Sequence, residues 1–362
     1  MTKVLIVDDS ALIRRVLSEI LSEAGFEIAV ARDGVEALAK LGAFQPDVVT
    51  LDVQMPNMSG LDCLDQIMLR RPCPVVMVSS LTAEGAEETL TALELGAVDF
   101  VPKPDGVVSL AVEELAPVLV EKVRAAANAR VGRANRLVER LRARRREART
   151  PAQPSRPVRV VNATKAQHVD DPKGIVLVGT STGGPAALEA VLCDIPGDFP
   201  WPILVAQHMP ATFTGSLASR LNGLCALTVS EVTGPMHLEA GVIYIARGGA
   251  DMVVSRRVSG LVVLPAPADD KYRWHPSVDR LVASAMTQVA PTQLIGVLMT
   301  GMGDDGAKAM TALHQAGGLT IAEAEETAVV WGMPGSLVRA GGADVVEPLE
   351  AIASRLIAMV PR

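Results

Sequence analysis

Residues 175–192 read IVLVGTSTGGPAALEAVL, and this stretch decides the fold of the second half of the chain. Four apolar, β-prone residues at 175–178 are followed by a turn of small residues and by a helical pattern over 186–192. The same alternation of strands and helices continues along the chain, with further β-rich runs at 203–206, 242–245, 295–299 and 320–321. Continuous apolar strands separated by helices are typical of a parallel sheet that helices cover on both faces. The sequence therefore predicts an α/β domain, with an added hairpin over 252–264 that turns at 258–260.

The first part of the chain repeats this pattern. Apolar, β-rich runs at 4–7, 48–51, 75–78 and 98–101 are separated by amphipathic segments. Between the two halves, residues 130–149 hold nine arginines and two glutamates, and prolines follow at 151, 154 and 157. A solvated helix that runs into a flexible linker fits this composition. We expect two doubly wound α/β domains with mainly parallel sheets, at 1–122 and 173–362, joined by an Arg-rich helix and Pro-containing linker at 123–172.

The bulk composition excludes several classes of protein. A chain of 362 residues is longer than one hydrophobic core usually serves, and the net charge of −7 argues against nucleic-acid binding. Four scattered cysteines form no C-x-x-C pair, so neither a zinc site nor a disulfide framework is indicated. The apolar run at the N-terminus is too short for a signal peptide, and no run approaches the ~18 residues of a membrane span. We therefore expect a cytoplasmic protein that is not inserted in a membrane.

Acidic and basic side chains follow the strands of the first domain. Asp8 and Asp9 come after the first run, Asp52 after the second and Lys103 after the fourth. Ligands of open parallel sheets bind beyond the carboxyl ends of the strands, so these groups should meet in one crevice. Mg²⁺ would neutralise the clustered carboxylates, and a metal-bound carboxylate beside a lysine suits phosphoryl transfer. Taken singly, each aspartate could instead be a turn residue or a helix cap, as Asp9 or Ser10 could be before a helix at 11.

These residues closely resemble a response-regulator receiver domain over the first ~120 positions. The resemblance is carried by Val7-Asp8-Asp9-Ser10, by the run from Asp52 to Gly60, by Ser79 and by Pro102-Lys103-Pro104. It implies a flavodoxin-like fold with Asp52 as the phosphorylated residue and a phosphorylated histidine kinase as the donor. The implied roles of the other residues are magnesium binding by Asp8, Asp9, Asp52 and the Gln54 carbonyl, and switching by Ser79, Lys103 and Phe100.

In the second domain, Gly179 to Gly183 form a G-x-S-x-G motif between a strand and a helix. This context exposes a nucleophilic serine, Ser181, on a tight turn, and the helix N-terminus behind it can stabilise a developing oxyanion. A Gly-rich turn before a helix can equally bind phosphate. The motif alone leaves phosphate binding open, although no G-K-[ST] and no obvious ribose-binding acid is present.

Ser181 needs a base and an orienting acid. His208 immediately follows the run at 203–206, so it should share the sheet edge of Ser181. A local triad of His275, Ser277 and Asp279 is rejected. Pro276 and Ser277 look like the start of a helix at 278–286, with Asp279 in its first turn, and residues two apart at a helix start do not face each other. The acid should come from Asp304 or Asp305, which follow the run at 295–299. Asp304 could cap the helix at 307–315, which would leave Asp305 for the catalytic role, but their spacing does not separate the two.

The second half resembles the catalytic domain of CheB-type protein-glutamate methylesterases over about residues 174–360. The segments that carry the resemblance are 179–184, 207–210, 275–279 and 298–306. The resemblance implies a Rossmann-like hydrolase without a metal at its active site, with Ser181 as nucleophile, His208 as base and Asp305 as orienting acid. Thr182 and Met302 fall at active-site positions of the family, and the Met302 N–H is the implied oxyanion donor. The long Arg-rich linker departs most from the family pattern.

The resemblance implies hydrolysis of glutamate methyl esters on the cytoplasmic helices of methyl-accepting receptors, with release of methanol. Deamidation of receptor glutamines by the same route is also implied. Two alternatives remain: a receiver protein whose C-terminal domain binds receptors without catalysis, and a transcription regulator. The acidic charge and the lack of a helix-turn-helix pattern disfavour the second.

Overall fold

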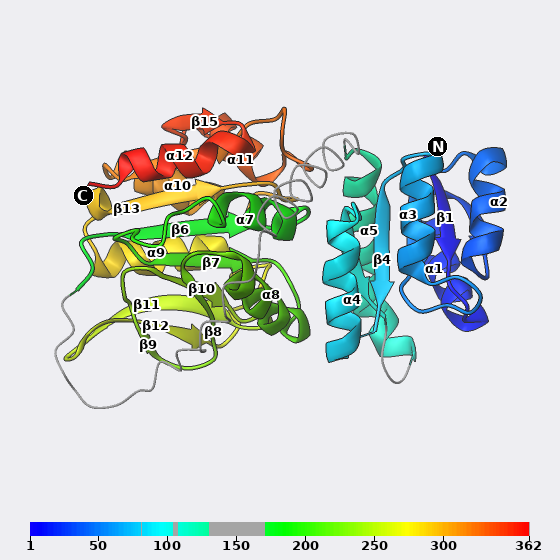
Figure 1. Ribbon diagram of the computed structural model, residues 1–362, viewed down its shortest axis with the longest axis horizontal. Coiled ribbons are helices and arrows are strands. Elements are labelled where there is room, and N and C mark those ends of the chain that lie inside the picture. Colours follow the sequence, from blue (N-terminus) through cyan, green and yellow to red (C-terminus); the bar gives the residue numbers. More distant parts are fainter. Residues whose placement is uncertain (81, 104–107, 130–170, 362) are drawn as a thin grey trace, which may run out of the picture.

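The computed structural model describes residues 1–80, 82–103, 108–129 and 171–361, which form two α/β domains (Figure 1). The predicted Arg-rich helix at 130–149 and most of the linker at 123–172 lie outside the described residues. Within the described ranges, no helix has the length and apolarity needed to cross a bilayer. The four cysteines are all free thiols.

The first domain is a five-stranded parallel sheet in the order β2-β1-β3-β4-β5, with helices on both faces. The four expected strands are present. Strand β2 was not expected. It lies at the sheet edge, and its apolar residues, Ile28 to Ala31, are half alanine and mostly not buried. Ser10 caps the first helix and accepts a hydrogen bond from the Ile13 N–H, as the sequence suggested. The elements are β1 (Lys3–Val7), α1 (Ala11–Glu23), β2 (Glu27–Ala31), α2 (Gly34–Phe44), β3 (Val48–Asp52), α3 (Gly60–Arg70), β4 (Val75–Ser79), α4 (Ala83–Glu94), β5 (Asp99–Pro102) and α5 (Val108–Ala127).

The second domain has a seven-stranded parallel sheet in the order β15-β14-β13-β6-β7-β10-β8. A small antiparallel sheet, β11-β12-β9, contains the expected hairpin, in which Arg257 pairs with Gly260. The edge strands β8 and β15 were not expected, and neither is a continuous buried run. The elements are β6 (Ile175–Thr180), α7 (Gly184–Leu192), β7 (Ile203–Gln207), α8 (Ala211–Leu224), β8 (Thr228–Val232), β9 (Met236–His237), β10 (Val242–Ala246), β11 (Asp251–Arg257), β12 (Gly260–Ala266), α9 (Val278–Gln288), the 3₁₀ helix η1 (Pro291–Gln293), β13 (Leu294–Leu298), α10 (Ala307–Gln315), β14 (Leu319–Glu323), α11 (Met333–Arg339), β15 (Val345–Glu347) and α12 (Leu349–Met359).

Strand β6 lies between β13 and β7, and all three strands are fully buried and parallel. Their register pairs Gly179 with Leu298 and with Ala206. The loops that follow the three strands therefore emerge side by side at one edge of the sheet. Those loops contain the three candidate catalytic residues of the sequence analysis.

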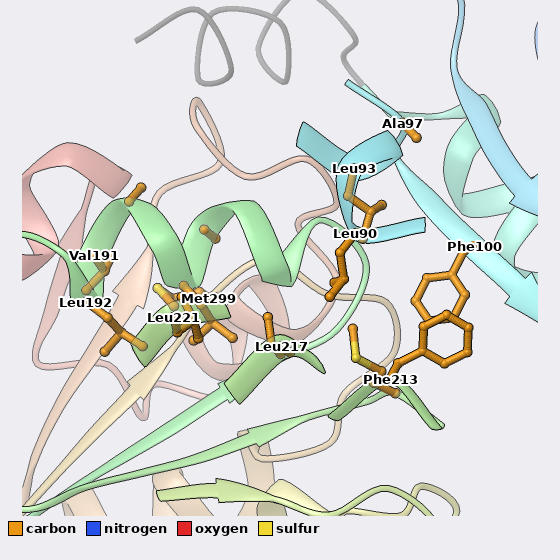
Figure 2. Close-up of a cluster of buried hydrophobic side chains, with 14 of the residues drawn as sticks. Leu90, Leu93, Ala97, Phe100, Val191, Leu192, Phe213, Leu217, Leu221 and Met299 are labelled. Atoms are coloured by element: carbon orange, nitrogen blue, oxygen red, sulfur yellow. The ribbon is translucent and has the colours of Figure 1, made fainter. Parts of the chain in front are cut away.

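The two domains pack against each other through α4, β5 and α5 of the first and through α7 and α8 of the second. Figure 2 shows Leu90 and Leu93 of α4 and Phe100 of β5 approaching Phe213 and Leu217 of α8. The rings of Phe100 and Phe213 have centroids 4.3 Å apart. Ion pairs join Glu94 to Arg220 and, with an N···O distance of 2.5 Å, Glu121 to Arg273. The contact therefore has an apolar centre and charged pairs around it.

A double-mutant cycle on Phe100→Ala and Phe213→Ala tests this contact. Aromatic pairs at such distances contribute about 0.5–1.5 kcal/mol beyond buried area, so we expect a coupling free energy of that size in denaturant unfolding of the full chain. A cycle that pairs Phe213→Ala with Val258→Ala, at the exposed turn of the hairpin, should show no coupling. Zero coupling between Phe100 and Phe213 would contradict the domain contact.

Candidate active site and receiver site

Carboxylates from two strand ends meet in the first domain, as the sequence predicted. One carboxylate oxygen from each of Asp8, Asp9 and Asp52 lies within 4.8 Å of the others. The Lys103 ammonium contacts Oδ2 of Asp52 at 2.7 Å and Oδ2 of Asp8 at 3.0 Å. Asp8 and Asp52 are buried and Asp9 is exposed. The site thus combines buried negative charge with one cation and an open side.

Burial governs the electrostatics of this cluster. It raises the pKa of Asp52 to about 6, with a smaller increase from the charge of Asp8, although contact with Lys103 acts in the opposite direction. Burial also raises the pKa of Asp8. For Lys103, burial alone would lower the pKa, but contacts with Asp52 and Asp8 outweigh it and the pKa is raised. Lys103 therefore stays charged, while the carboxylates remain under-neutralised, which suits a hard divalent cation with oxygen ligands.

Of the remaining receiver residues, Ser79 and Gln54 lie at or just after the ends of β4 and β3, and Phe100 lies elsewhere. The Ser79 side chain is fully buried at the end of β4, and its hydroxyl donates to the Gly85 carbonyl at 3.2 Å. The Gln54 N–H donates to Asp52 Oδ1 at 3.3 Å, and its side chain donates to Glu88 at 3.1 Å. Phe100 does not lie in the cluster but in the domain contact, where it packs on Phe213.

Ser181 lies in the turn that follows β6, as expected from the G-x-S-x-G motif. Its N–H donates to the Thr300 carbonyl at 3.0 Å, which ties the turn to the end of β13. Gly183, with φ of 77°, is the N-cap of α7, a backbone conformation that favours glycine. The turn thus places the start of α7 at the same sheet edge as the ends of β13 and β7.

Gln207, the last residue of β7, holds this turn in place, and sequence reasoning missed it. Its side-chain amide donates to the Ser181 carbonyl at 2.9 Å and to the His208 carbonyl at 3.1 Å. Its Oε1 accepts from the Thr180 hydroxyl at 2.6 Å. A Cβ at Gly184 would lie 1.9 Å from that Oε1, so this position requires glycine. One buried amide therefore locks together the loops of Ser181 and His208.

His208 and Asp305 form the expected pair. His208 Nε2 lies 2.8 Å from Asp305 Oδ2, and the His208 N–H donates to the Thr180 carbonyl at 3.1 Å, next to Ser181. Nδ1 of His208 is buried and has no hydrogen-bond partner among the described residues. No hydrogen bond joins the Ser181 hydroxyl to His208 in the described part of the chain. The imidazole is therefore held by the acid at one nitrogen and has the other nitrogen unengaged.

Asp305 accepts three further hydrogen bonds from the start of α9. The donors are the Ser277 hydroxyl at 3.0 Å, the Val278 N–H at 2.7 Å and the Asp279 N–H at 3.1 Å. Burial alone would raise the pKa of Asp305, but the hydrogen bonds from His208 and from this backbone outweigh it and the pKa is lowered. Asp305 therefore stays ionised beside His208.

The structure separates the two aspartates that spacing could not. Asp305 is buried against His208, whereas Asp304 is exposed. The suggestion that Asp304 caps the following helix is wrong: the N-cap of α10 is Gly306, with φ of 89° and no side-chain cap. Ser277 caps α9, so a helix does begin within residues 275–279, which was the reason to reject a local triad there. This segment contributes to the site by binding Asp305.

Thr182 lies in the Ser181 turn itself, and Met302 lies in the loop that follows β13. Met302 is nearly buried, and its N–H donates no hydrogen bond within the described residues. The Thr182 hydroxyl donates to the carboxylate of Asp99, at the start of β5 in the first domain. Lys122 of α5 also contacts Asp99, at 2.7 Å. A residue adjacent to Ser181 is thus bonded directly to the receiver side of the molecule.

Glu323, at the end of β14, also supports the site. No motif in the sequence indicated this role. It is fully buried, and it accepts hydrogen bonds from the Thr300 N–H at 2.7 Å and from the Thr327 hydroxyl at 3.0 Å. Burial raises the pKa of Glu323 to about 7. The Thr300 hydroxyl donates to the Thr182 carbonyl at 2.8 Å, so Glu323 holds a residue that contacts the Ser181 turn.

Comparison with known proteins agrees with both halves of this description. Residues 176–356 match the family model described as CheB methylesterase, and residues 4–112 match the model described as response regulator receiver domain. The crystal structure of the Thermotoga maritima CheB methylesterase catalytic domain is similar, with a TM-score of 0.50 and 38% identity, over 52% of this chain and 98% of that chain.

Full-length relatives have the same two parts in one chain. The protein-glutamate methylesterase/protein-glutamine glutaminase 2 of Rhodopseudomonas palustris is 54% identical over 358 residues, 99% of this chain and 98% of the relative. The protein-glutamate methylesterase/protein-glutamine glutaminase 3 of Rhodospirillum rubrum is 54% identical over 366 residues, 100% of this chain and 97% of the relative. This chain therefore belongs to the family of CheB methylesterases that carry a response regulator receiver domain.

Proposed function

We propose that this protein hydrolyses γ-glutamyl methyl esters on receptor helices, using Ser181, His208 and Asp305, and that phosphorylation of Asp52 controls the reaction. The observation that carries the proposal is the His208–Asp305 pair at the sheet edge from which Ser181 emerges. An ionised acid on Nε2 leaves Nδ1 as the nitrogen that can accept a proton. A phosphate-binding turn would not need this buried pair.

The reaction is acyl transfer. His208 removes the Ser181 hydroxyl proton as Oγ attacks the ester carbonyl, and the Met302 N–H donates to the oxyanion that forms. The imidazolium returns its proton to the departing methoxide, and methanol leaves. Water then attacks the acyl-enzyme by the same route and releases the glutamate carboxylate. Asp305 stabilises the imidazolium during both steps, since it remains ionised.

The same site would deamidate receptor glutamines and release ammonia. An amide is a poorer electrophile than an ester, so this reaction is the slower of the two. The substrates are the cytoplasmic helices of methyl-accepting receptors, and the protein works in the cytoplasm, without binding nucleic acid. The relatives named above carry both activities in their names, which supports this assignment.

Asp52 is the proposed phosphoryl acceptor, with a phosphorylated histidine kinase as donor. Asp8, Asp9, Asp52 and the Gln54 carbonyl would hold Mg²⁺, and the clustered carboxylates fit such an ion. When bound, the ion would supply positive charge to balance the phosphoryl oxygens. Lys103 adds a second cation at 2.7 Å from Asp52, and Ser79 would turn its hydroxyl toward the added phosphoryl group.

The unphosphorylated receiver blocks the active site in this proposal. Ser181, His208 and Asp305 are only 7%, 8% and 9% exposed with the receiver in place. Thr182 is bonded to Asp99, and Phe100 packs on α8, so the receiver face made by α4, β5 and α5 lies at the catalytic edge. A receptor helix needs that face to move away. Movement of Ser79 and Phe100 after phosphorylation would weaken the contact.

The alternative of a non-catalytic receptor-binding domain is tested by Ser181→Ala. We expect loss of methanol release from methylated receptors by about 10⁴-fold or more, with an unchanged circular dichroism spectrum. Ser255→Ala, a serine in β11 away from the site, should retain full activity. A Ser181→Ala protein with a tenth of the wild-type rate would show that Ser181 is not the nucleophile.

Asp305→Asn and Asp304→Asn should differ strongly in their effect on kcat. An asparagine at 305 would turn an amide N–H toward some of the donors that surround the carboxylate, so we expect kcat to fall at least about 10²-fold. Asp304 is exposed, so its replacement should change kcat less than about twofold. The comparison is of steady-state kcat for methanol release, and equal losses in both variants would overturn the assignment of the acid.

The regulatory proposal predicts a difference between a fragment of residues 173–362 and the full chain. We expect the fragment to hydrolyse receptor methyl esters about tenfold or more faster than the unphosphorylated full chain. A small phosphodonor should raise the full-chain rate only with Mg²⁺ present, and chelation of the ion or Asp52→Asn should remove this activation. Equal rates for fragment and full chain under all conditions would refute occlusion and favour a role for the receiver in targeting.

A further inference from the structure

An aromatic ring lies against the His208 imidazole. Trp274, in the loop before α9, stacks on His208 with ring centroids 5.1 Å apart and an interplanar angle of 14°. Trp274 is half-buried, and His208 is nearly buried. The near-parallel geometry brings the face of the indole, and not its edge, to the imidazole.

The hydrogen bonds of His208 do not fix the plane of its ring. Asp305 contacts Nε2 at 2.8 Å, and Nδ1 has no partner among the described residues. A single hydrogen bond at one nitrogen leaves the ring able to tilt about that contact. A flat surface against the ring opposes this tilt, because stacked aromatic rings attract each other beyond the effect of their buried area. The indole thus restricts the motion that the acid does not.

The segment that contains Trp274 also holds the acid. Ser277 Oγ and the Val278 N–H, three and four residues later, donate to Asp305 at 3.0 and 2.7 Å. His275, the next residue, contacts Asp251 at 3.1 Å and accepts at its carbonyl from the Gly249 N–H at 3.2 Å. Trp274 therefore belongs to an anchored segment that contacts both the imidazole and its carboxylate partner.

Trp274 has a second neighbour that reaches the receiver. The Arg273 guanidinium lies 5.1 Å from the centroid of the Trp274 ring, and it pairs with Glu121 of α5 at 2.5 Å. The indole face therefore accommodates a cation in this structure. The same property would stabilise an imidazolium, since the negative face of an aromatic ring attracts a cation.

We propose that Trp274 is a positioning residue for catalysis, which keeps the His208 ring in the plane that presents Nδ1 to Ser181 and stabilises its protonated form. The inference rests on the proposed function, in which His208 is the base. It assigns Trp274 no contact with the reacting atoms. Its effect should therefore appear in kcat for every substrate, irrespective of size.

Trp274→Ala and Trp274→Phe, made in the full chain and assayed with Mg²⁺ and a small phosphodonor, test this role. The substrates are 4-nitrophenyl acetate and methylated receptor in membranes. We expect Trp274→Ala to lower kcat about fivefold on both, with KM for the small ester within about twofold, and Trp274→Phe to restore most of the loss. The acid limb of the kcat/KM profile of Trp274→Ala should move to lower pH, because the protonated imidazole loses its aromatic face.

Tyr272→Ala is the matched control, since this ring lies on the same segment but contacts Lys271 and Arg280. It should leave kcat and the pH profile unchanged. An unchanged kcat in Trp274→Ala would overturn the proposal. A loss confined to KM for the receptor would also overturn it, and would instead make Trp274 part of the receptor-binding surface. Failure of the proposed function is distinguishable, since wild-type and Ser181→Ala proteins would then release methanol at equal rates.

Discussion

The parallel pairing of β13, β6 and β7 is the constraint on which the rest of the structure depends. Ladder hydrogen bonds continue past the ends of these strands, from the Ser181 N–H to the Thr300 carbonyl and from the His208 N–H to the Thr180 carbonyl. Three loops that are far apart in sequence are thereby held at one edge. The catalytic groups need no further long-range element to come together, because the sheet register has already placed their backbones.

Buried polar groups then convert this placement into a defined geometry. Gln207 bonds to the loops of Ser181 and His208, Glu323 holds Thr300, and the start of α9 surrounds Asp305 with donors. Each is expensive to bury without its partners, so the loops have one well-satisfied arrangement and few alternatives. An ionised Asp305 would also stabilise an imidazolium that forms when His208 accepts a proton. The chemistry at the edge thus depends on a polar network that lies mostly behind it.

The receiver uses the same architecture for a different chemistry. Its carboxylates also follow parallel strands, but burial there raises the pKa of Asp52 and Asp8 where the network around Asp305 lowers it. The difference arises from the number of donors: Asp305 accepts from His208 and from three donors at the start of α9, while Asp8 and Asp52 share one lysine and accept one backbone N–H each. Under-neutralised charge suits a site that takes a cation and a phosphoryl group. Thr182 and Asp99 bring the two sites into direct contact across the domain boundary.

The sequence by itself determined the fold class, the receiver cluster, and Ser181 and His208 as members of one site. Buried parallel strands appear in the sequence as continuous apolar runs, and the residues that follow them lie at one edge of the sheet. Edge strands were missed for two reasons: polar residues interrupt β8, and half of the apolar run in β2 is alanine, which has a low β-propensity. Only the tertiary structure decided between Asp304 and Asp305. Adjacent residues have nearly the same spacing to the other motifs along the chain, and only the folded chain shows which side chain points toward His208. It alone revealed Gln207, Glu323 and Trp274, since a supporting side chain is defined by neighbours that are distant in sequence and leaves no local pattern of its own.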